Sequence, residues 1–336
     1  MKFKSFAVLL GLLGMLSALA LPARAADVKQ LEAQVERVRT GFHGRMAVYM
    51  KNLTTGDEIA LDADRVHETF SIIKVPIMVE VLRQAESGAF SLSDRIELKA
   101  ADARWPSGVL YALDPGLRPT IKDLLSLMII ISDNAATDLL GDKVGRANVT
   151  KTMHGLGFEK TSVEHSDLDW DRTWLGTLDP HFRSAPVEEV MRFPFDKFTD
   201  AQVDEAFRHV IEDTDMYFGR STAREMGRLF EKMARGELVS KQASDLMLTI
   251  LKKQQVNNRF PRYLRGITVA HKTGDGQPWV ANDAGILWVN NQPIVLVVFT
   301  DHDRLEISAL HEAIARVAAL VARHYGGQLA SDFEPR

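Results

Sequence analysis

The chain contains no cysteine among its 336 residues, so it can form neither a disulfide nor a lipid attachment at a cysteine. It also lacks an excess of basic residues: the formal net charge is −4, which leaves no positive field for nucleic acid or anionic lipid. Internal repeats and low-complexity linkers are absent as well. With 46% hydrophobic and 26% charged residues, the composition is typical of a globular protein with a substantial core.

The N-terminus has the order of a secretory signal. A basic start precedes an apolar run from Phe6 to Leu21, and Ala23-Arg24-Ala25 matches an A-x-A cleavage site. Pro22 and Arg24 end the run below the ~20 residues that a membrane span needs. We therefore predict a signal peptide over residues 1–25, a periplasmic or secreted protein, and no stable membrane anchor after cleavage.

Segments rich in β-forming residues occur at both ends of the chain. There are five of them, at 45–51, 58–61, 266–271, 283–289 and 294–300. Amphipathic helical patterns at 27–42 and 305–325 accompany them. We predict an α+β fold, in which a five-stranded antiparallel sheet is flanked by N- and C-terminal helices.

The chain between these ends is mostly helical in pattern. We expect residues 26–65 and 266–336 to form one lobe and residues 66–265 to form an inserted helical lobe. Ligand sites favour the interface between such units. The candidate site should therefore lie in a cleft between the sheet and the helices.

Three short strings carry the candidate chemistry: Ser71-Ile72-Ile73-Lys74, Ser132-Asp133-Asn134 and His271-Lys272-Thr273-Gly274. Each string has an ordinary structural interpretation when it stands alone, namely a helix cap, a turn between helices and a strand end. Their occurrence together and in this order indicates an active site, because S-x-x-K, S-D-N and K-T-G are the catalytic motifs of acyl-transferring serine enzymes.

The residue types fit that chemistry. Ser71 begins a buried helix predicted over 70–85, and Lys74 lies one turn along the same face. A lysine amine can take a proton from a hydroxyl only if burial or a nearby cation lowers its pKa, and Lys272 across the cleft is such a cation. Ser132 and Asn134, two residues apart in a non-helical corner, can both face the cleft.

The three strings resemble those of the penicillin-recognising serine enzymes, most closely the class A β-lactamases. The resemblance implies that Ser71 is the nucleophile, that Lys74 transfers its proton, and that Ser132 relays a proton to the leaving nitrogen. It also implies that Asn134 binds the side-chain amide of the substrate. The substrate would be a small-molecule β-lactam or a D-alanyl peptide-like compound, and the enzyme a monomer without cofactor or metal.

By the same resemblance, the third string binds the other end of the substrate. Lys272 and Thr273 would bind its carboxylate, and Gly274 would leave room for its close approach. The Asp275 N–H would form the oxyanion hole together with the Ser71 N–H. The family's carboxylate-binding arginine is missing from the following strand, and Arg220, Arg259 and Arg262 are all candidates to replace it.

The sequence departs from the family in an enlarged omega-loop region, about residues 162–220. Alignment through Gly155-Leu156-Gly157 places Asp167 where the family has the glutamate that positions the deacylating water. The same alignment places Asp171 where the family has asparagine, while Glu164 and Asp169 are close enough to replace Asp167. The extra segment, residues 172–218, either covers the mouth of the cleft or packs on the surface.

Other catalytic classes lack their motifs. The chain has no G-x-S-x-G elbow, no H-E-x-x-H zinc motif and no glycine-rich phosphate loop. The leading hypothesis is a serine β-lactamase that works through a Ser71 acyl-enzyme. Two alternatives stay open: a D-alanyl peptide hydrolase or esterase with the same acylation machinery, and a penicillin-binding receptor without turnover.

Overall fold

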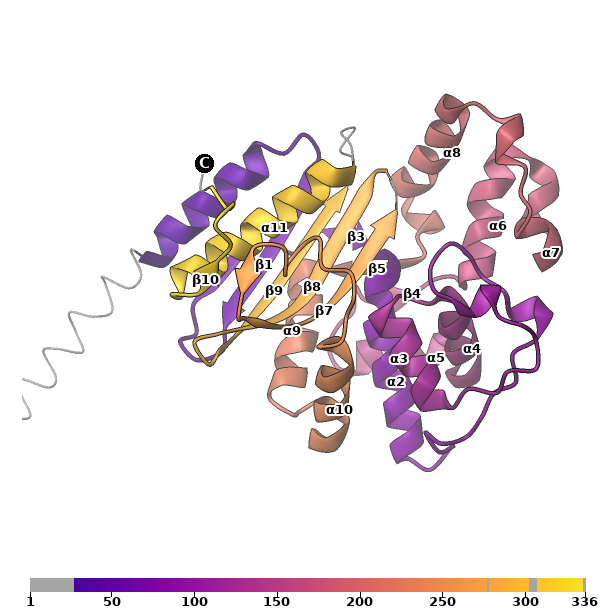
Figure 1. Ribbon diagram of the computed structural model, residues 1–336, viewed down its shortest axis with the longest axis horizontal. Coiled ribbons are helices and arrows are strands. Elements are labelled where there is room, and N and C mark those ends of the chain that lie inside the picture. Colours follow the sequence, from indigo (N-terminus) through magenta and orange to yellow (C-terminus); the bar gives the residue numbers. More distant parts are fainter. Residues whose placement is uncertain (1–26, 277, 302–306, 335–336) are drawn as a thin grey trace, which may run out of the picture.

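The computed structural model describes residues 27–276, 278–301 and 307–334, and the predicted signal peptide lies outside them (Figure 1). A five-stranded antiparallel sheet has the strand order β2-β1-β9-β8-β7. Its strands are β1 (Arg45–Asn52), β2 (Glu58–Leu61), β7 (Thr268–Gly276), β8 (Val280–Val289) and β9 (Gln292–Asp301). The predicted α+β fold with this sheet is therefore confirmed, and segments from both ends of the sequence meet in it.

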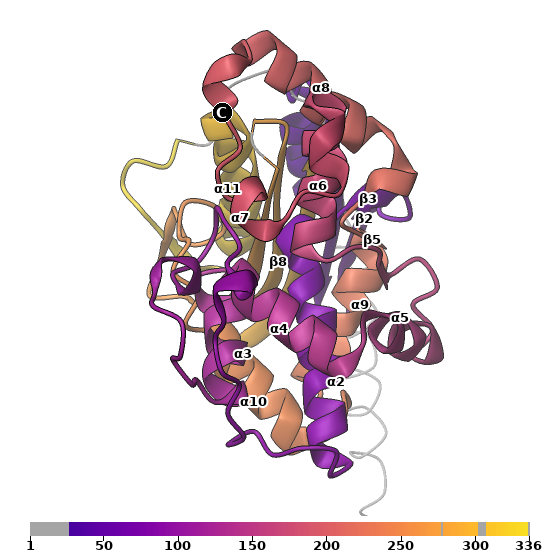
Figure 2. The ribbon, with the colours of Figure 1, turned by 90° about the vertical axis from the view of Figure 1, so that its right-hand side faces the viewer.

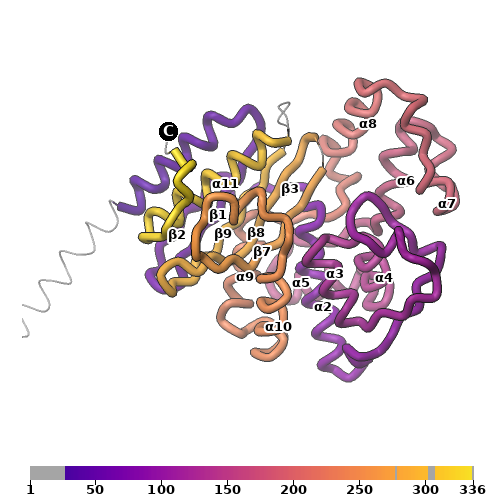
Figure 3. The backbone as a smooth tube through the Cα atoms, in the orientation of Figure 1, coloured from indigo at the N-terminus to yellow at the C-terminus, as the bar shows by residue number. Residues whose placement is uncertain are grey.

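Helices cover both faces of this sheet. Leu31 and Val35 of the N-terminal helix (residues 27–40) and Val317 of α11 (Ile307–His324) pack on one face, against Val48 and Leu296. The N-terminal helix and α11 therefore lie on the same side of the sheet, as Figure 3 shows. The opposite face packs on α9 (Ala223–Ala234) and on the helices beyond it. These are α2 (Lys74–Glu86), α3 (Ile121–Ile130), α4 (Asn134–Val144), α5 (Arg146–Gly155) and α10 (Lys241–Leu251).

The strand that carries K-T-G is longer than predicted. The sequence favours a strand end at His271, because Gly274 and Gly276 have low β-propensity. In the structure β7 runs to Gly276, since each of its residues is paired with β8, including Thr273 with Asp283. Backbone pairing with a long neighbouring strand thus overrides the local sequence preference.

The helix predicted over 70–85 is two elements in the structure. A short 3₁₀ helix, Phe70–Ile73, comes first, and α2 begins at Lys74. Phe70 has a φ of 44°, a left-handed conformation that is uncommon for a bulky residue. Ser71 therefore lies in a tight turn directly after a strained residue, rather than in the first turn of an α-helix.

The enlarged region leaves and rejoins the fold at one small sheet. Its strands are β3 (Val66–Glu68), β5 (Gly219–Thr222) and β4 (Ser162–Val163), in the order β3-β5-β4. Between β4 and β5 the chain forms α6 (Asp167–Leu178), α7 (Val187–Val190) and α8 (Asp200–Glu212), which Figure 2 shows beside α4 and above it. Thr199 caps α8 in a capping box with Gln202, as the sequence favours.

An apolar cluster of its own holds this region together. Trp174, Phe182, Phe193 and Phe207 are among its buried side chains, and Phe70 joins them from the neighbourhood of Ser71. The region is therefore packed on the candidate site as well as on itself. In the part of the chain that the structure describes, no helix is both long enough and apolar enough to cross a membrane.

Candidate active site

A cavity of about 460 Å³ lies between the K-T-G strand, the S-D-N corner and the enlarged region. Five of the residues predicted for the site line it: Ser71, Ser132, Asn134, Asp167 and Asp275. Lys74, Lys272 and Thr273 lie behind this lining, with 0%, 0% and 1% of their surface exposed. The three strings, far apart in sequence, are thus brought to one place.

Lys74 is held by the S-D-N corner. Its Nζ donates to the Ser132 carbonyl at 2.8 Å, to Ser132 Oγ at 3.2 Å and to Asn134 Oδ1 at 2.6 Å. Ser132 can offer both oxygens to one amine because its φ of 60° turns its carbonyl and its hydroxyl toward α2. Burial, the largest effect, lowers the pKa of Lys74, against the opposing charge of Asp167.

Lys272 reaches the same hydroxyl from the other side. Its Nζ donates to Ser132 Oγ at 3.0 Å and to the Thr273 carbonyl at 2.7 Å. Burial lowers the pKa of Lys272 well below its ordinary value, and the positive charge of Lys74 lowers it further. Two buried amines therefore share one hydroxyl, which is a path along which a proton can move. We call Ser71, Lys74, Ser132, Asn134 and Lys272 the polar cluster.

Backbone packing fixes the turn that carries Ser71. A side chain at Gly274 would collide with the Thr69 carbonyl, so this glycine is needed for contact between β7 and the turn. The sequence analysis assigned that space to the substrate; in the structure it is filled by the protein's own backbone. Asn282 of β8 adds a hydrogen bond of 3.0 Å from its Nδ2 to the Glu68 carbonyl.

Glu68 is a buried carboxyl that the sequence analysis missed. Its Oε1 accepts from the Phe70 N–H at 2.8 Å, and its Oε2 accepts from the Phe218 N–H at 2.6 Å. Burial raises the pKa of Glu68 to about 8, although these backbone donors oppose the shift. Glu68 therefore ties the residue before Ser71 to the point where the enlarged region returns.

Asp167 begins α6, the first helix of the enlarged region. Ser166 caps the helix through the Asp169 N–H at 2.9 Å, and Asp138 of α4 accepts the Asp167 N–H at 2.8 Å. Asp138 also pairs with Arg104 and Arg146, at 2.6 and 2.8 Å. The sequence does not single out Asp138 as an anchor, because α4 also contains Thr137, Asp142 and Lys143.

The Asp167 carboxyl faces the cavity. Its Oδ2 is buried and has no hydrogen-bond partner among the described residues. Burial raises the pKa of Asp167 to about 7, while the charge of Lys74 lowers it. Asp171, one turn along, also lines the cavity, and burial together with the charge of Asp167 raises its pKa well above the ordinary range. A carboxyl oxygen that faces the cavity and has no hydrogen-bond partner among the described residues is suited to hold a water molecule.

The alternatives to Asp167 lie elsewhere. Glu164 pairs with Arg220 at 2.8 Å, and the 59% exposed side chain of Asp169 accepts a hydrogen bond from the Ser166 hydroxyl at 2.6 Å. Neither is among the residues that line the cavity. Among the three candidate carboxylates, geometry therefore favours Asp167.

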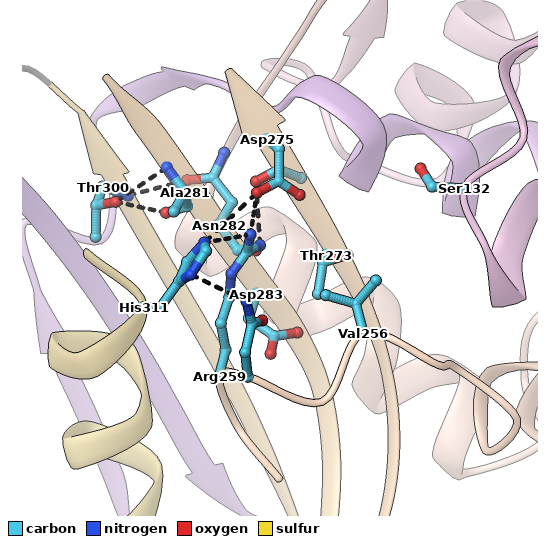
Figure 4. Close-up of polar contacts among 12 residues, drawn as sticks. Ser132, Val256, Arg259, Thr273, Asp275, Ala281, Asn282, Asp283, Thr300 and His311 are labelled. Carbon is cyan, nitrogen blue, oxygen red and sulfur yellow. Dashed lines mark hydrogen bonds and ion pairs between the residues drawn. The ribbon is translucent and has the colours of Figure 1, made fainter. Parts of the chain in front are cut away.

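Arg259 is the candidate arginine that the structure brings to the K-T-G strand (Figure 4). It is 1% exposed, and its Nη1 donates to the carbonyls of Asn282 at 2.6 Å and Gly274 at 3.3 Å. Its Nη2 pairs with the Asp275 carboxylate and lies 3.0 Å from His311 Nε2. Burial opposes ionisation of Asp275, but Arg259 and His311 hold its pKa below the ordinary value.

The other two candidates are engaged at other carboxylates. Arg220 pairs with Glu164, as described above, and Arg262 lies 3.4 Å from Glu312. The sequence could not anticipate that the Asp275 carboxylate would pair with Arg259, because Arg259 lies in a preceding loop and only the packing of that loop against β7 and β8 brings the two residues together.

The enlarged region contributes directly to the cavity. Val203, Asp204 and Phe207 of α8 are lining residues, as are Trp170 and Trp174 of α6. Of the two possibilities left open for residues 172–218, a cover over the cleft mouth is the one that this placement supports. Among the described residues, no group of three or more histidine, aspartate or glutamate side chains is arranged to hold a metal ion.

Comparisons with known proteins point to one family. The family model described as "Beta-lactamase enzyme family" matches residues 30–325. A β-lactamase of Streptomyces lavendulae is 25% identical over 94% of this chain and 92% of its own length. The β-lactamase CTX-M-97 of Escherichia coli is 24% identical over 92% of this chain and 93% of its own.

Solved structures show the same fold. A β-lactamase from Sphaerobacter thermophilus matches with a TM-score of 0.70 and 26% identity, over 88% of this chain and 97% of its own. The acyl-enzyme that a mutant of PBP-A forms with penicillin G also matches with a TM-score of 0.70, at 22% identity, over 88% of this chain and 96% of its own. Because the family model matches residues 30–325, which is most of the chain, this chain belongs to the beta-lactamase enzyme family.

Proposed function

We propose that this protein is an exported, monomeric serine β-lactamase that opens β-lactam rings through an acyl-enzyme on Ser71. The observation that carries the proposal is the convergence of two buried lysines on Ser132 Oγ, beside Ser71 on the wall of one cavity. Such an arrangement has a clear chemical use, because it can take a proton from one oxygen and deliver it to another group nearby.

In the acylation step, Ser71 Oγ attacks the carbonyl carbon of the β-lactam. Its proton passes to the amine of Lys74, whose pKa burial lowers. The N–H groups of Ser71 and Asp275 stabilise the oxygen that becomes negative. Ser132 then gives its proton to the ring nitrogen and is resupplied by Lys74, so the carbon–nitrogen bond breaks and the ester remains.

In the deacylation step, Asp167 takes a proton from a water molecule held at its uncompensated oxygen. The water oxygen attacks the ester carbonyl, and Ser71 leaves with a proton. An aspartate is one methylene shorter than the family's glutamate, and ~1 Å of misplacement can cost ~10²-fold in rate. This difference is the specific reason to keep the two alternatives: a D-alanyl peptide hydrolase or esterase with the same acylation machinery, and a penicillin-binding receptor without turnover.

The test is turnover of nitrocefin by the purified protein, followed by intact-protein mass spectrometry. We expect steady hydrolysis, and a transient mass increase that maps to the peptide containing Ser71. Ser71→Ala should abolish both signals. A stable adduct without hydrolysis would favour the receptor, and an adduct that persists in Ser71→Ala would overturn the proposal.

A further inference from the structure

The lining of the cavity has an unusual composition. It contains six aromatic side chains: Phe70, Trp105, Trp170, Trp174, Phe207 and Phe218. Four aspartates also line it: Asp167, Asp171, Asp204 and Asp275. No lysine, arginine or histidine is among its described lining residues. A cavity with this lining offers aromatic faces and carboxyl groups to a ligand.

The lysines and the arginine near the cavity do not offset the acidic and aromatic character of its surface. Lys74 and Lys272 are completely buried, and each donates its hydrogen bonds to the S-D-N corner or to its own strand. Burial also lowers the pKa of both amines. Arg259 is buried as well, and the Asp275 carboxylate neutralises its guanidinium.

The four aspartates play different parts. Asp275 is paired with Arg259, and burial raises the pKa values of Asp167 and Asp171, so these carboxyls carry less negative charge. Asp204 differs from them, because it is exposed on α8 and makes no hydrogen bond or ion pair with a described residue. It is the carboxylate that remains for a ligand.

The aromatic side chains near Asp204 on the cavity wall pack against one another. The Phe207 ring stacks on Phe70 with centroids 6.1 Å apart, and Trp170 meets both rings edge-on at 5.7 and 5.4 Å. Trp174 contacts Phe207 edge-on at 5.8 Å. Aromatic faces attract cations, and more strongly when the site excludes water.

We infer that this cavity selects substrates whose acyl side chain combines an aromatic or apolar body with a positive charge. The body would pack on the rings of α6 and α8, and the cation would lie between an aromatic face and the Asp204 carboxylate. The inference rests on the proposed function for covalent capture of the substrate. It names α8 as the specificity-determining element of the site, with Phe207 and Asp204 as its main contacts.

Three penicillins that differ at one carbon test the inference. Ampicillin carries an ammonium group at the α-carbon of its phenylacetyl side chain, benzylpenicillin carries hydrogen, and carbenicillin carries a carboxylate. Second-order acylation rate constants should fall in that order, with about a fivefold step for each change of charge. Equal rates, or a faster reaction with carbenicillin than with ampicillin, would overturn the inference.

Variants assign the preference to Asp204. Asp204→Asn should reduce the ratio of the ampicillin rate to the carbenicillin rate at least threefold. Asp196→Asn is the matched control, since Asp196 is also exposed in the enlarged region but does not line the cavity. It changes the net charge equally and should leave the ratio unchanged. An equal loss in both variants would contradict a specific contact.

Calorimetry separates this inference from the proposed function. Ser71→Ala cannot be acylated, so its non-covalent affinities for the three penicillins report the charge preference alone. Tightest binding of ampicillin would support the inference even if the unsubstituted protein failed to react with any penicillin, a result that would overturn the proposed function. Equal affinities would overturn the inference while leaving catalysis intact.

Discussion

The polar cluster and the aromatic region above it share one cavity but are held together by different forces. In the polar cluster, hydrogen bonds between 2.6 and 3.2 Å fix Lys74 on two neighbouring side chains. In the aromatic region, rings such as Trp174 and Phe207 pack edge to face. Hydrogen bonds are directional and costly to leave unmade when buried, whereas apolar packing tolerates changes of similar volume. Substitutions in the polar cluster should therefore cause large losses of activity, whereas substitutions in the aromatic region should cause smaller losses that follow the change in side-chain volume.

The largest expected effect on acylation comes from replacing either of the two lysines, and the two replacements should act differently. Lys74→Ala removes the proposed proton acceptor, so acylation should slow by about 10²–10⁴-fold, mainly in the rate constant at saturation. Lys272→Ala removes a charge and a donor to Ser132, so it should weaken substrate capture as well. Stopped-flow acylation over a range of β-lactam concentrations distinguishes the two. Unchanged acylation in Lys74→Ala would remove this residue from the mechanism.

The next effect concerns Asp167, where the polar cluster meets the aromatic region. Asp167→Asn should acylate at nearly the normal rate and then stall, with deacylation slowed by about 10²-fold or more, because only the second step needs this base. Mass spectrometry would show the adduct accumulating. Glu164→Gln is the control, and a stall there instead would transfer the role to Glu164.

The pKa of Asp167 adds a pH dependence to that step. Asp167 acts as a base only when ionised, and burial raises its pKa to about 7. As the pH falls from 7 to 5, the ionised fraction of Asp167 drops about 50-fold, so deacylation of the unsubstituted protein should slow in parallel. A deacylation rate that is flat between pH 5 and 7 would contradict Asp167 as the base.

A smaller effect, and of opposite sign, is expected at the K-T-G strand. Asp275→Asn removes the carboxylate that neutralises Arg259, while the carbonyls of Gly274 and Asn282 still hold the guanidinium. The apparent affinity for β-lactams with a carboxylate should rise by about fivefold. Measurement of KM for a substrate with and without that carboxylate tests the change. An equal response of both substrates would show that Arg259 stays inaccessible.

The smallest effect tests whether the aromatic region loosens independently. Thr199→Ala removes the cap of α8, which should cost about 1 kcal/mol. Limited proteolysis should become faster within residues 172–218, with little change in acylation. Thr120→Ala removes an equivalent capping box on α3, outside that region, and serves as the matched control. Equal protection of residues 172–218 in both variants would argue against local loosening.

The sequence was sufficient for the parts that depend on local pattern. Segments rich in β-forming residues predicted the five strands of the main sheet, and amphipathic patterns predicted the helices at both ends of the chain. The three strings were also found from sequence, since a motif keeps its order whatever the fold around it does. Their contacts, such as Lys272 on Ser132, required the structure.

The features that the sequence did not predict depend on contacts between residues far apart in the chain, which leave no pattern in the local sequence. Phe70 adopts a positive φ because the stacking of its ring on Phe207 and the bond from its N–H to Glu68 stabilise that conformation. The pairing of Asp275 with Arg259 joins a strand to a preceding loop. In each case, the partner is supplied by an element whose position only the folded chain determines.

The pairing of β4 with β5 has a consequence for how this region can vary. Val163 pairs with Gly219, so everything between them is a loop whose ends are already closed. Each doubling of the length of a closed loop adds only about 0.6 kcal/mol of entropic cost. Insertions and deletions at the tips of this loop are thus thermodynamically inexpensive, provided that the paired ends and Glu68 are kept. Changes of length that keep Asp167 and the contact between Phe207 and Phe70 leave the nucleophile in place.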